Sequence, residues 1–472
     1  MEFGLPVETV APRPEKRPGI GIVHLGLGAF FRAHGAVYIA EAMQVSGGDW
    51  GVLGVSLQSE TTRNALKPQG FAYTAVEQGP GGDIRRLIDV VQDVRVATED
   101  PGAVLAAMAA SGVKIVSLTV TEKGYCHNPA DGKLNRQHPD IVHDISNPLP
   151  RSAHGFLVRA LALRRAAGLA PFTAMTCDNL PENGRVLRGV VLDLAQTIDP
   201  ELADWIGTHG RFPCTMVDRI VPATKPGDIA RLAEAGIRDA APVMHEPFRQ
   251  WVVEDDFVGG ARPDLAAVGV QLVRDVTAYE HMKLRMLNGT HSSLAYLGYL
   301  AGHHTMAETV ADSVFARFVK RLWTEEIIPV LTPPPGEDLH AYAAALFDRY
   351  ANPAIRHRTW QIAMDGSQKL PQRILGTLAE NVAAGRASPG LMLAVAGWMR
   401  YVGAVDDAGA AIDVKDPIAK TLKILANQGV MALLSLRSVF PADLADAIEP
   451  AVAAAYARLV AVGARAAAAE LA

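Results

Sequence analysis

Cysteine is scarce in this chain of 472 residues. Cys126, Cys177 and Cys214 are too few and too widely spaced for a disulfide framework or a cysteine-based zinc site. The sequence also lacks an evident cluster of Cys, His and Glu ligands, so we expect no metal. A reducing compartment suits such a chain, and we predict a cytoplasmic protein.

Neither sign of charge predominates. The chain has 45 Lys and Arg against 50 Asp and Glu, a formal net charge of −5. This gives no basic footprint for nucleic acid, although local patches can still bind a small anion. The longest apolar run, residues 102–121, is broken by Ser111, Gly112 and Lys114. It predicts a helix, a turn and a buried strand rather than a membrane span.

Length and patterning set the domain organisation. A chain this long, with 49% hydrophobic residues, should form two or more domains with ample core. Residues 1–19 carry prolines and charges without the apolar core of a signal peptide, and predict a mobile arm. Short apolar runs alternate with amphipathic segments over residues 20–272, whereas residues 273–472 are rich in Ala and Leu with few strand signals. The pattern predicts an α/β fold, with a doubly wound, Rossmann-type sheet domain followed by a mainly α-helical domain.

The first folded element is the apolar run GIVHLGL at residues 21–27, which an amphipathic segment follows at residues 32–43. The turn between them has Gly26 and Gly28, the first two glycines of a dinucleotide fingerprint, but a phenylalanine where the third would stand. These glycines would let the backbone approach a pyrophosphate at a helix N-terminus, and Arg32 would supply charge. A plain strand-to-helix turn is the alternative interpretation.

The end of the second strand, at residues 51–57, bears on the choice between NAD and NADP. A dinucleotide fold places an acidic ribose-binding residue there. The only acid nearby, Glu60, is displaced to where a helix cap with Ser59 or Thr61 is also expected. No Arg or Lys directly follows Leu57, which favours NAD, while Arg63 leaves NADP open.

Polar residues follow the nearly continuous apolar strand at residues 113–121. Thr121, Glu122 and Lys123 stand at its carboxyl end, where a doubly wound sheet places its ligands. The alternative is a loop with an ordinary ion pair between the last two residues.

The next apolar strand, at residues 172–177, is followed in the same way by Asn179. Because Pro181 is typical of a helix start, a helix N-cap at Asp178 or Asn179 is the alternative to a ligand-binding role. Asp218, at the end of a further short apolar segment, has the same ambiguity.

The helical pattern of residues 277–300, TAYEHMKLRMLNGTHSSLAYLGYL, contains a polar inset. At about 100° per residue, Glu280, Lys283, Asn288 and His291 share an arc of roughly 140° on an otherwise apolar helix. Burial moves the pKa of a lysine toward neutrality, which makes it a usable general base. An asparagine can donate to developing negative charge on oxygen, and a histidine can hold a neighbouring hydroxyl. The set suits the oxidation of an alcohol, and a hydrogen-bonded core network is the alternative.

Several of these stretches closely resemble the polyol-specific long-chain dehydrogenases, a family that includes mannitol dehydrogenase and fructuronate reductase. The resemblance runs from Gly21 to about Gly463 and is carried by IVHLGLGAFFRAH, SLTVTEKGY, TCDNLPENG, MVDRIVP, EPFRQWVVED and MKLRMLNGTHSSLAYLGYL. The K-x4-N-x2-H pattern at Lys283, Asn288 and His291 is specific to that family.

The resemblance implies that NAD and substrate bind between the two domains and that catalysis needs no metal. It implies that Lys283 is the acid/base, that Asn179 and Asn288 polarise the carbonyl, and that Glu280 assists proton exchange with solvent. His291 completes the predicted catalytic set. The predicted cofactor-binding residues are Gly26, Leu27, Gly28, Ala29, Phe30, Arg32, Thr121 and Glu122. We expect a small-molecule partner, a sugar acid or polyol, and a monomer or weak homo-oligomer.

Three other classes are less consistent with the sequence. Tyr279 and Lys283 have the spacing of the short-chain dehydrogenase dyad, but those enzymes are shorter and lack a large helical domain after it. A non-catalytic sugar or dinucleotide sensor would not need Lys283, both asparagines and His291. A zinc-type polyol dehydrogenase would need a metal-ligand cluster.

The choice between an aldonate and a neutral polyol rests on three cations. The stretches TEKGYC, from residue 121, and HRTWQIAMDGSQKLPQR, from residue 357, look like the fructuronate reductase side of the family, which predicts D-mannonate and D-fructuronate as substrates. The predicted substrate-binding residues are Asp218, Lys123, Lys369 and Arg373, with the cations facing a carboxylate. Alternatively, these cations only balance Glu122 and Asp365, and the enzyme is a mannitol 2-dehydrogenase or another polyol dehydrogenase.

Overall fold

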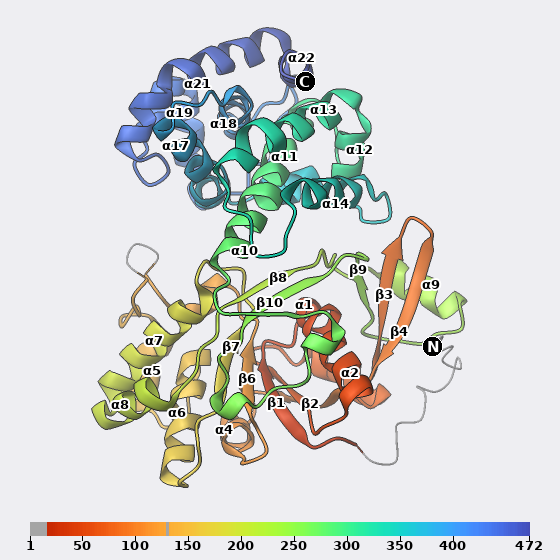
Figure 1. Ribbon diagram of the computed structural model, residues 1–472, viewed down its shortest axis with the longest axis vertical. Coiled ribbons are helices and arrows are strands. Elements are labelled where there is room, and N and C mark those ends of the chain that lie inside the picture. Colours follow the sequence, from red (N-terminus) through yellow and green to blue (C-terminus); the bar gives the residue numbers. More distant parts are fainter. Residues whose placement is uncertain (1–16, 129–131) are drawn as a thin grey trace. The chain divides into compact units, whose positions relative to one another are not determined.

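The computed structural model describes residues 17–128 and 132–472 and divides the chain into two compact units (Figure 1). The first, here the sheet unit, runs to Thr277, and the second, the helical unit, comprises Ala278–Ala472. The division lies a few residues beyond the boundary predicted between residues 272 and 273. Residues 1–16 of the predicted N-terminal arm, which comprises residues 1–19, lie outside the described residues.

A parallel sheet of five strands forms the centre of the sheet unit. The strands are β1 (Ile20–Leu25), β2 (Gly51–Ser56), β5 (Val91–Val96), β6 (Ile115–Leu118) and β7 (Thr173–Thr176), in the spatial order β5-β2-β1-β6-β7. All neighbouring strands pair in parallel. The strand order reverses between β1 and β6, and a doubly wound sheet binds its ligand outside the carboxyl ends of the strands at such a switch point. The predicted Rossmann-type fold is confirmed.

The helices of the sheet unit lie between and after these strands in the chain. They are α1 (Ala29–Ala33), α2 (Gly35–Ser46), α3 (Thr61–Leu66), α4 (Pro101–Ala109), α5 (Pro139–Ser146), α6 (Ala153–Ala166), α7 (Asn183–Ile198), α8 (Pro200–His209) and α9 (Pro226–Glu234). The helix predicted over residues 32–43 is broken at His34, between α1 and α2. The His34 ring turns inward, where its Nε2 lies 2.9 Å from the Gln250 carbonyl.

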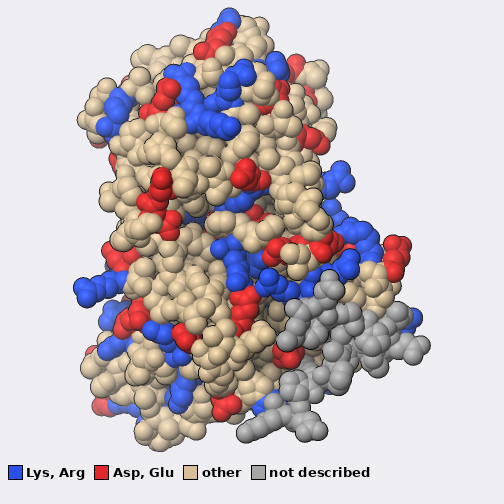
Figure 2. All heavy atoms as spheres, turned by 45° about the vertical axis from the view of Figure 1, so that its right-hand side comes forward, with Lys and Arg blue, Asp and Glu red and all other residues tan. Residues whose placement is uncertain are grey.

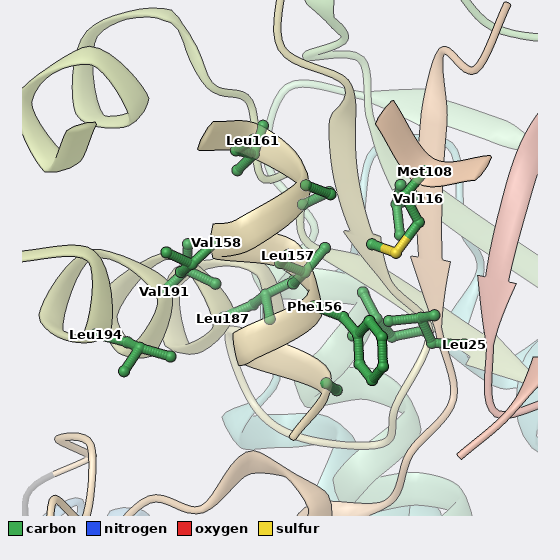
Figure 3. Packing of buried hydrophobic residues seen from close by; sticks show 14 of the residues in the cluster. Leu25, Met108, Val116, Phe156, Leu157, Val158, Leu161, Leu187, Val191 and Leu194 are labelled. Atoms are coloured by element: carbon green, nitrogen blue, oxygen red, sulfur yellow. The ribbon is translucent and has the colours of Figure 1, made fainter. Parts of the chain in front are cut away.

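The core of the sheet unit has one apolar cluster on each face of the sheet. Val23 and Leu25 of β1 belong to one cluster and Ile22 to the other, as the alternation of side chains along a strand requires. Figure 3 shows α6 between the sheet and α7, with Phe156 directed toward Leu25. Each side chain of this size stabilises the fold by about 1.5–3 kcal/mol when fully buried.

Two smaller sheets complete this unit. One has the order β4-β3-β9 and the other β11-β10-β8. Their strands are β3 (Tyr73–Gly79), β4 (Gly82–Ile88), β9 (Val243–His245), β8 (Thr215–Asp218), β10 (Gln250–Glu254) and β11 (Gln271–Val273). The sequence of residues 86–96 predicts a single strand, which is wrong, because β4 folds back antiparallel onto β3 and ends before β5 begins. Gly82, with φ of 112°, permits that tight hairpin.

The helical unit confirms the predicted mainly α-helical domain. Its α-helices are α10 (Thr277–Met282), α11 (Thr290–Leu300), α12 (Met306–Ala311), α13 (Ser313–Arg321), α14 (Leu339–Ala351), α15 (Thr359–Ala363), α16 (Gly366–Leu370), α17 (Gly376–Ala383), α18 (Pro389–Val402), α19 (Ala419–Gln428), α20 (Val430–Leu434), α21 (Ala442–Val462) and α22 (Ala464–Ala469). Three further segments are π-helices: η5 (Lys283–Gly289), η6 (Leu322–Ile327) and η8 (Pro371–Leu375).

The centre of the helical unit is the pair α11 and α18, both almost entirely buried. They pack closely, since a Cβ added to Gly397 would lie 2.8 Å from Leu297 Cδ2. Farther along the chain, Gly463 with φ of 80° separates α21 from α22. Within the described residues, none of the helices combines the length and apolarity that crossing a membrane requires.

Surface charge is mixed in both units. On the face drawn in Figure 2, small groups of Lys and Arg lie next to Asp and Glu. Many are paired, as Arg86 and Arg249 are with Glu41, both at 2.6 Å. Such exposed pairs add little to stability, about 0–1 kcal/mol each.

Candidate active site

In the glycine turn after β1, the fold requires glycine at one position but not at the other. Gly26 has φ of 91°, and a Cβ there would lie 2.2 Å from the Thr119 carbonyl oxygen, so the fold itself requires glycine. Gly28, with φ of −88°, is the N-cap residue directly before α1. The nearest atom to a Cβ added there would be the Gly26 oxygen, at 3.8 Å. The fold makes no such demand at Gly28, so the turn keeps open space where the fingerprint places a pyrophosphate.

The other predicted residues of the turn lie in and around the start of α1. Leu27 is buried, and Ala29 and Phe30 are half-buried. The Phe30 ring stacks on His34 with a centroid distance of 5.0 Å.

Arg32 does not have the predicted position. Its guanidinium is buried, donates to the Ala241 carbonyl at 2.5 Å and lies over the Tyr73 ring at 5.3 Å. The side chain extends from α1 toward the β4-β3-β9 side of the unit, where its charge is engaged inside the fold. Arg32 is therefore not a candidate for binding the pyrophosphate. Helical periodicity could not show this, since a residue at a helix start can face either way.

The end of β2 carries an ion-pair network. Arg63 is bonded to Glu60 at 2.9 Å and also to Glu99. Glu60 is the N-cap residue of α3 without a side-chain cap bond, while the Thr61 N–H donates to Ser59 Oγ at 3.2 Å. Arg63, the residue that left NADP open, is therefore already neutralised by two carboxylates.

The loop after β6 is held in a strained conformation. Thr121 has φ of 64° and ψ of 163°, a combination that L side chains rarely adopt and that carries about 1–3 kcal/mol of strain. The backbone of Glu122 and Lys123 continues into a short 3₁₀ turn, but the side chains of these two predicted site residues lie outside the described part of the structure. Strained backbone is enriched at functional sites.

Asp178, directly after β7, stabilises that loop. Its carboxylate accepts the N–H of Val120 at 3.1 Å and of Thr121 at 2.8 Å. It also accepts the Tyr125 hydroxyl at 3.0 Å. Burial raises the pKa of Asp178, and these donors oppose the rise. The residue is thus no helix N-cap, because α7 begins at Asn183 with Glu182 as its N-cap.

Asn179 is exposed at the carboxyl end of β7, beside this loop. The sheet unit therefore brings together three of the predicted elements at one edge: the Gly26–Gly28 turn, Thr121 and Asn179. Asp218 is placed differently, since it ends β8 in the β11-β10-β8 sheet and is buried opposite Gln250.

Lys283, Asn288 and His291 lie on one continuous helix of the helical unit, but its middle is not α-helical. Residues from Lys283 to Gly289 form the π-helix η5, between α10 and α11. In an α-helix, residues five apart differ by about 140°, whereas the i→i+5 bonds of a π-helix bring them close to one full turn apart. The π-helix therefore brings Lys283 and Asn288 closer to one face of the helix than the predicted 140° arc. π-segments occur frequently at functional sites.

The carbonyls of η5 have side-chain partners. Met286 O accepts the Thr290 hydroxyl at 2.6 Å and the Trp323 Nε1–H at 2.9 Å. Leu287 O accepts the Tyr350 hydroxyl at 2.8 Å. These bonds compensate the backbone groups that the wider turn leaves without regular α-helical partners.

His291 is buried in a group of rings and cations. Its ring stacks on Tyr350 at 5.2 Å and meets His357 edge-on at 4.7 Å. Burial lowers the pKa of His291 well below its usual range and that of His357 to about 4. Both imidazoles are therefore neutral at pH 7 and can each donate one hydrogen bond. Three cations add to the lowering of the His291 pKa: Arg373, Arg349 and Lys369.

Lys369 lies on α16 and Arg373 on η8. Directly before α16, Asp365 has φ of 55°, in the turn that an Asp-Gly pair favours. Lys369 Nζ donates to the Met364 carbonyl at 2.5 Å, and burial lowers its pKa to about 8. Arg373 donates to Ser292 Oγ at 3.1 Å, next to His291.

The two π-helices η5 and η8 approach each other closely at Gly289. A Cβ there would lie 2.6 Å from the Arg373 carbonyl oxygen. Gly289 thus fixes Arg373 against the helix that carries Lys283 and Asn288. Glu280, the remaining predicted catalytic residue, is half-buried one turn earlier on α10.

Three residues near the candidate site were not predicted from the sequence: Asp178, Tyr350 and His357. No periodic pattern distinguishes them, because each acquires its role from residues far away in the chain. Tyr279, whose spacing to Lys283 mimics the short-chain dehydrogenase dyad, is buried and donates to the Pro335 carbonyl at 3.1 Å. The three cysteines are buried and free, and no metal-binding cluster of His, Cys, Asp or Glu occurs among the described residues.

Known families match both units. The Mannitol dehydrogenase Rossmann domain matches residues 20–267 and the Mannitol dehydrogenase C-terminal domain matches residues 275–460. The D-mannonate oxidoreductase of Escherichia coli (strain K12) is 49% identical over 458 residues, which is 94% of each chain. The mannitol 2-dehydrogenase of Pyrenophora tritici-repentis is 40% identical over 449 residues, which is 93% of this chain and 79% of that one.

A solved structure agrees with these matches. The mannitol 2-dehydrogenase of Pseudomonas fluorescens, in a ternary complex with NAD and D-mannitol, superposes with a TM-score of 0.86. The two proteins are 38% identical, and the superposition covers 99% of this chain and 96% of the other. The chain therefore belongs to the mannitol dehydrogenase family and is an oxidoreductase.

Proposed function

We propose that the protein interconverts D-mannonate and D-fructuronate with NAD as the redox cofactor. The observation that carries the choice of an acidic sugar is the cationic surrounding of His291, which Arg373, Arg349 and Lys369 supply. A carboxylate would compensate these charges, and Arg and Lys are the usual partners of carboxylates. The 49% identity to a D-mannonate oxidoreductase, against 40% to a mannitol 2-dehydrogenase, supports the same choice.

NAD is the cofactor, and the sheet unit fits it. The positive φ of Gly26 and the open space at Gly28 form a cradle that a larger residue would fill. Bound there, NAD would accept the hydride that leaves the alcohol carbon. NADH should bind more tightly than NADPH, because Arg63 is already engaged by Glu60 and Glu99. Equal or tighter binding of NADPH in fluorescence titrations would contradict this preference.

Lys283 is the proposed proton carrier. Its side chain is 8% exposed, on the π-helix η5. In the oxidative direction Nζ takes the hydroxyl proton, and in the reductive direction it returns a proton to the carbonyl oxygen. A neutral amine is needed for the first task, and an ammonium for the second.

The two asparagines are the proposed polarising groups. The amides of Asn179 and Asn288 each offer N–H donors to the carbonyl oxygen, where negative charge develops on reduction. His291, neutral in its buried place, donates to a neighbouring hydroxyl. Glu280, half-buried one turn before Lys283, passes the proton to solvent. In this division of roles residues 20–272 bind the cofactor and contribute Asn179, while residues 273–472 hold the substrate and supply the other catalytic residues.

Mannitol and fructose are the second candidate pair, because the solved relative was determined with D-mannitol. A neutral polyol would leave Lys369 and Arg373 to act through hydrogen bonds alone. A sensor without catalysis is a remote alternative that any turnover would exclude.

One assay separates these candidates. NADH oxidation is measured with fructuronate and with fructose, and NAD reduction with mannonate, mannitol, arabinitol and sorbitol. We expect the highest catalytic efficiency with fructuronate and mannonate. Higher efficiency with fructose and mannitol would place the enzyme with the polyol dehydrogenases. A chelator should leave the activity unchanged if no metal takes part.

A further inference from the structure

We propose that Asp178 is a positioning residue, which fixes the loop after β6 and the start of the loop after β7 in the arrangement that the candidate active site needs. The sequence patterns assign this residue no role except a helix cap, which α7 does not use. This inference rests on the proposed function only for the expected change in kcat, because hydrogen exchange and NADH binding can be measured without turnover.

The Asp178 carboxylate accepts hydrogen bonds from the loop after β6 and from the end of β7. Oδ1 accepts the Thr121 N–H at 2.8 Å, and Oδ2 accepts the Val120 N–H at 3.1 Å and the Tyr125 hydroxyl at 3.0 Å. The Thr176 hydroxyl, two residues earlier on β7, lies 3.4 Å from Oδ2. The end of β6 is therefore tied to the end of β7 through one side chain.

The loop that Asp178 holds does not have a relaxed conformation of its own. Thr121 combines a β-branched side chain with φ of 64°, and such a residue persists only where its surroundings over-determine it. Two bonds hold that residue: its N–H donates to Asp178 Oδ1, and its carbonyl accepts the Gly124 N–H at 2.9 Å inside the turn itself, so Asp178 provides the bond that ties Thr121 to another part of the fold. Without it, we expect Thr121 to return to an extended conformation with negative φ, which would displace the following turn.

Asp178 itself is not a candidate base or ligand. It is 7% exposed, and its two oxygens already face four donors. A carboxylate with filled acceptor sites acts through the groups it holds. Those groups are Thr121, on one side, and the exposed neighbour Asn179, whose backbone continues directly from Asp178.

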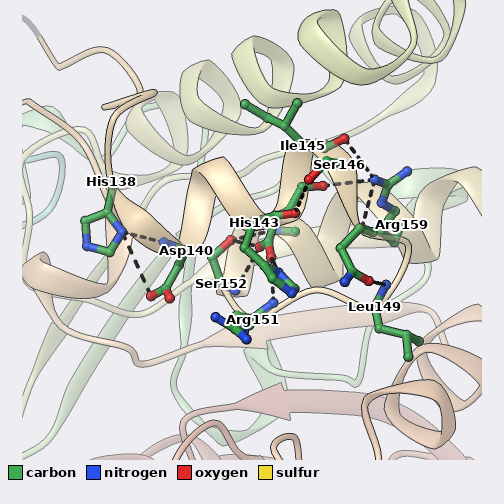
Figure 4. Close-up of polar contacts among 12 residues, drawn as sticks. His138, Asp140, His143, Ile145, Ser146, Leu149, Arg151, Ser152 and Arg159 are labelled. Carbon is green, nitrogen blue, oxygen red and sulfur yellow. Dashed lines mark hydrogen bonds and ion pairs between the residues drawn. The ribbon is translucent and has the colours of Figure 1, made fainter.

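The molecule contains a matched control. Asp144 is also buried and also accepts two consecutive backbone N–H groups, from Arg151 at 2.8 Å and Ser152 at 2.9 Å, two residues that Figure 4 labels. It accepts the Ser152 hydroxyl at 2.6 Å as well. These bonds connect α5 to the start of α6, and neither partner stands at a strand end. Asp144→Asn therefore removes a similar network without changing the candidate site.

The decisive experiment compares Asp178→Asn with Asp144→Asn. Asparagine keeps the size of the side chain but replaces one acceptor oxygen by a donor, which then opposes a backbone N–H. In Asp178→Asn we expect amide hydrogen exchange over residues 119–125 to accelerate roughly ten-fold or more, and the Kd of NADH to rise roughly ten-fold. The kcat should fall as well. In Asp144→Asn the melting temperature should fall comparably, with the Kd of NADH and kcat unchanged.

The proposal is overturned if Asp178→Asn leaves the exchange of residues 119–125 and the Kd of NADH unchanged, or if both variants change kcat alike. Should Asp178→Asn fail to fold, Tyr125→Phe removes one donor and keeps the loop. It should accelerate the same exchange by a smaller factor, and no change would also overturn the proposal. Absence of turnover in the wild type with every sugar acid and polyol would refute the proposed function instead, while the exchange measurement still tests Asp178.

Discussion

The candidate residues around the glycine turn of the sheet unit stand on loops at strand ends, whereas the catalytic candidates of the helical unit stand on a single continuous helix. In the sheet unit a short loop gains its shape from backbone hydrogen bonds and one carboxylate, Asp178. In the helical unit the change from α to π period, over Lys283–Gly289, aligns the polar side chains. The comparison shows two ways to pre-organise a site: constraint of a loop by its neighbours, and a local change of helical pitch.

The largest effect is expected at Lys283. Lys283→Ala should lower turnover by about 10²- to 10⁴-fold, because general acid/base help is worth that much. The Kd of NADH should hardly change, since the glycine turn lies in the sheet unit. Lys283→Arg keeps the positive charge but cannot release its proton near neutral pH, so it should lose as much. Near-normal turnover in either variant would show that Lys283 is not the proton carrier and belongs to a hydrogen-bonded core network instead.

Asn179 and Asn288 test the comparison directly, because one stands on a strand-end loop and the other on the π-helix. If both steady negative charge on the carbonyl oxygen, each alanine variant should lose about 10²- to 10³-fold in kcat. Asn288→Asp, which keeps the shape and removes the donors, should lose as much. A normal kcat in one alanine variant alone would restrict the oxyanion role to the other unit.

Much of the sheet unit follows from its sequence. Apolar runs ending in glycine or polar residues predict parallel strands, and parallel strands present their carboxyl ends at one edge. The order of these runs along the chain is therefore enough to place Thr121 and Asn179 near the Gly26–Gly28 turn. The order of the runs does not show which way the Arg32 side chain points. Only the fold shows that its guanidinium contacts the Ala241 carbonyl and the Tyr73 ring.

The helical unit shows a different limit. The polar residues of the catalytic helix are recognisable from their types and their resemblance to a family, but the assumed 100° per residue misplaces Lys283 relative to Asn288. A π-segment depends on distant groups that accept or donate to its backbone, here Trp323 and Tyr350. His357 could not be found for the same reason, because its contact with His291 exists only in the folded chain.

Substitutions at the two glycines of the turn should distinguish an effect on folding from an effect on NADH binding. Gly26→Ala should destabilise the protein by about 1–3 kcal/mol or more, because the residue has φ of 91° and its Cβ would meet the Thr119 carbonyl. Gly28→Val meets no such obstacle in the fold and should keep the melting temperature, yet block NADH by filling the cradle. Thermal melting and NADH titration on both variants measure the difference. Tight NADH binding by a folded Gly28→Val variant would exclude the turn as the pyrophosphate site.

The smallest effect concerns Lys369 and the charge of the substrate. Burial, and next Arg373, lower the pKa of Lys369 to about 8, so the free enzyme loses this charge as pH rises through that value. The kcat/KM for mannonate should then fall by up to about ten-fold per pH unit above pH 8, relative to kcat/KM for mannitol. The ratio isolates Lys369, because a pH effect on the proton-transfer step that both substrates share changes both kcat/KM values alike. Lys369→Met should lower the efficiency with mannonate below pH 8 and leave the ratio independent of pH.

Stability should respond to the same group with the opposite sign. Since the pKa of Lys369 is lower in the folded protein than the ordinary 10.5, the unfolded chain binds more protons between pH 8 and that value. The contribution of Lys369 to the free energy of unfolding therefore increases with pH in this window, while its contribution to mannonate binding decreases. Melting curves of wild type and Lys369→Met across this window measure the first effect, and the ratio of kcat/KM values the second. A ratio of kcat/KM values that stays constant with pH in the wild type would show that Lys369 does not face the carboxylate.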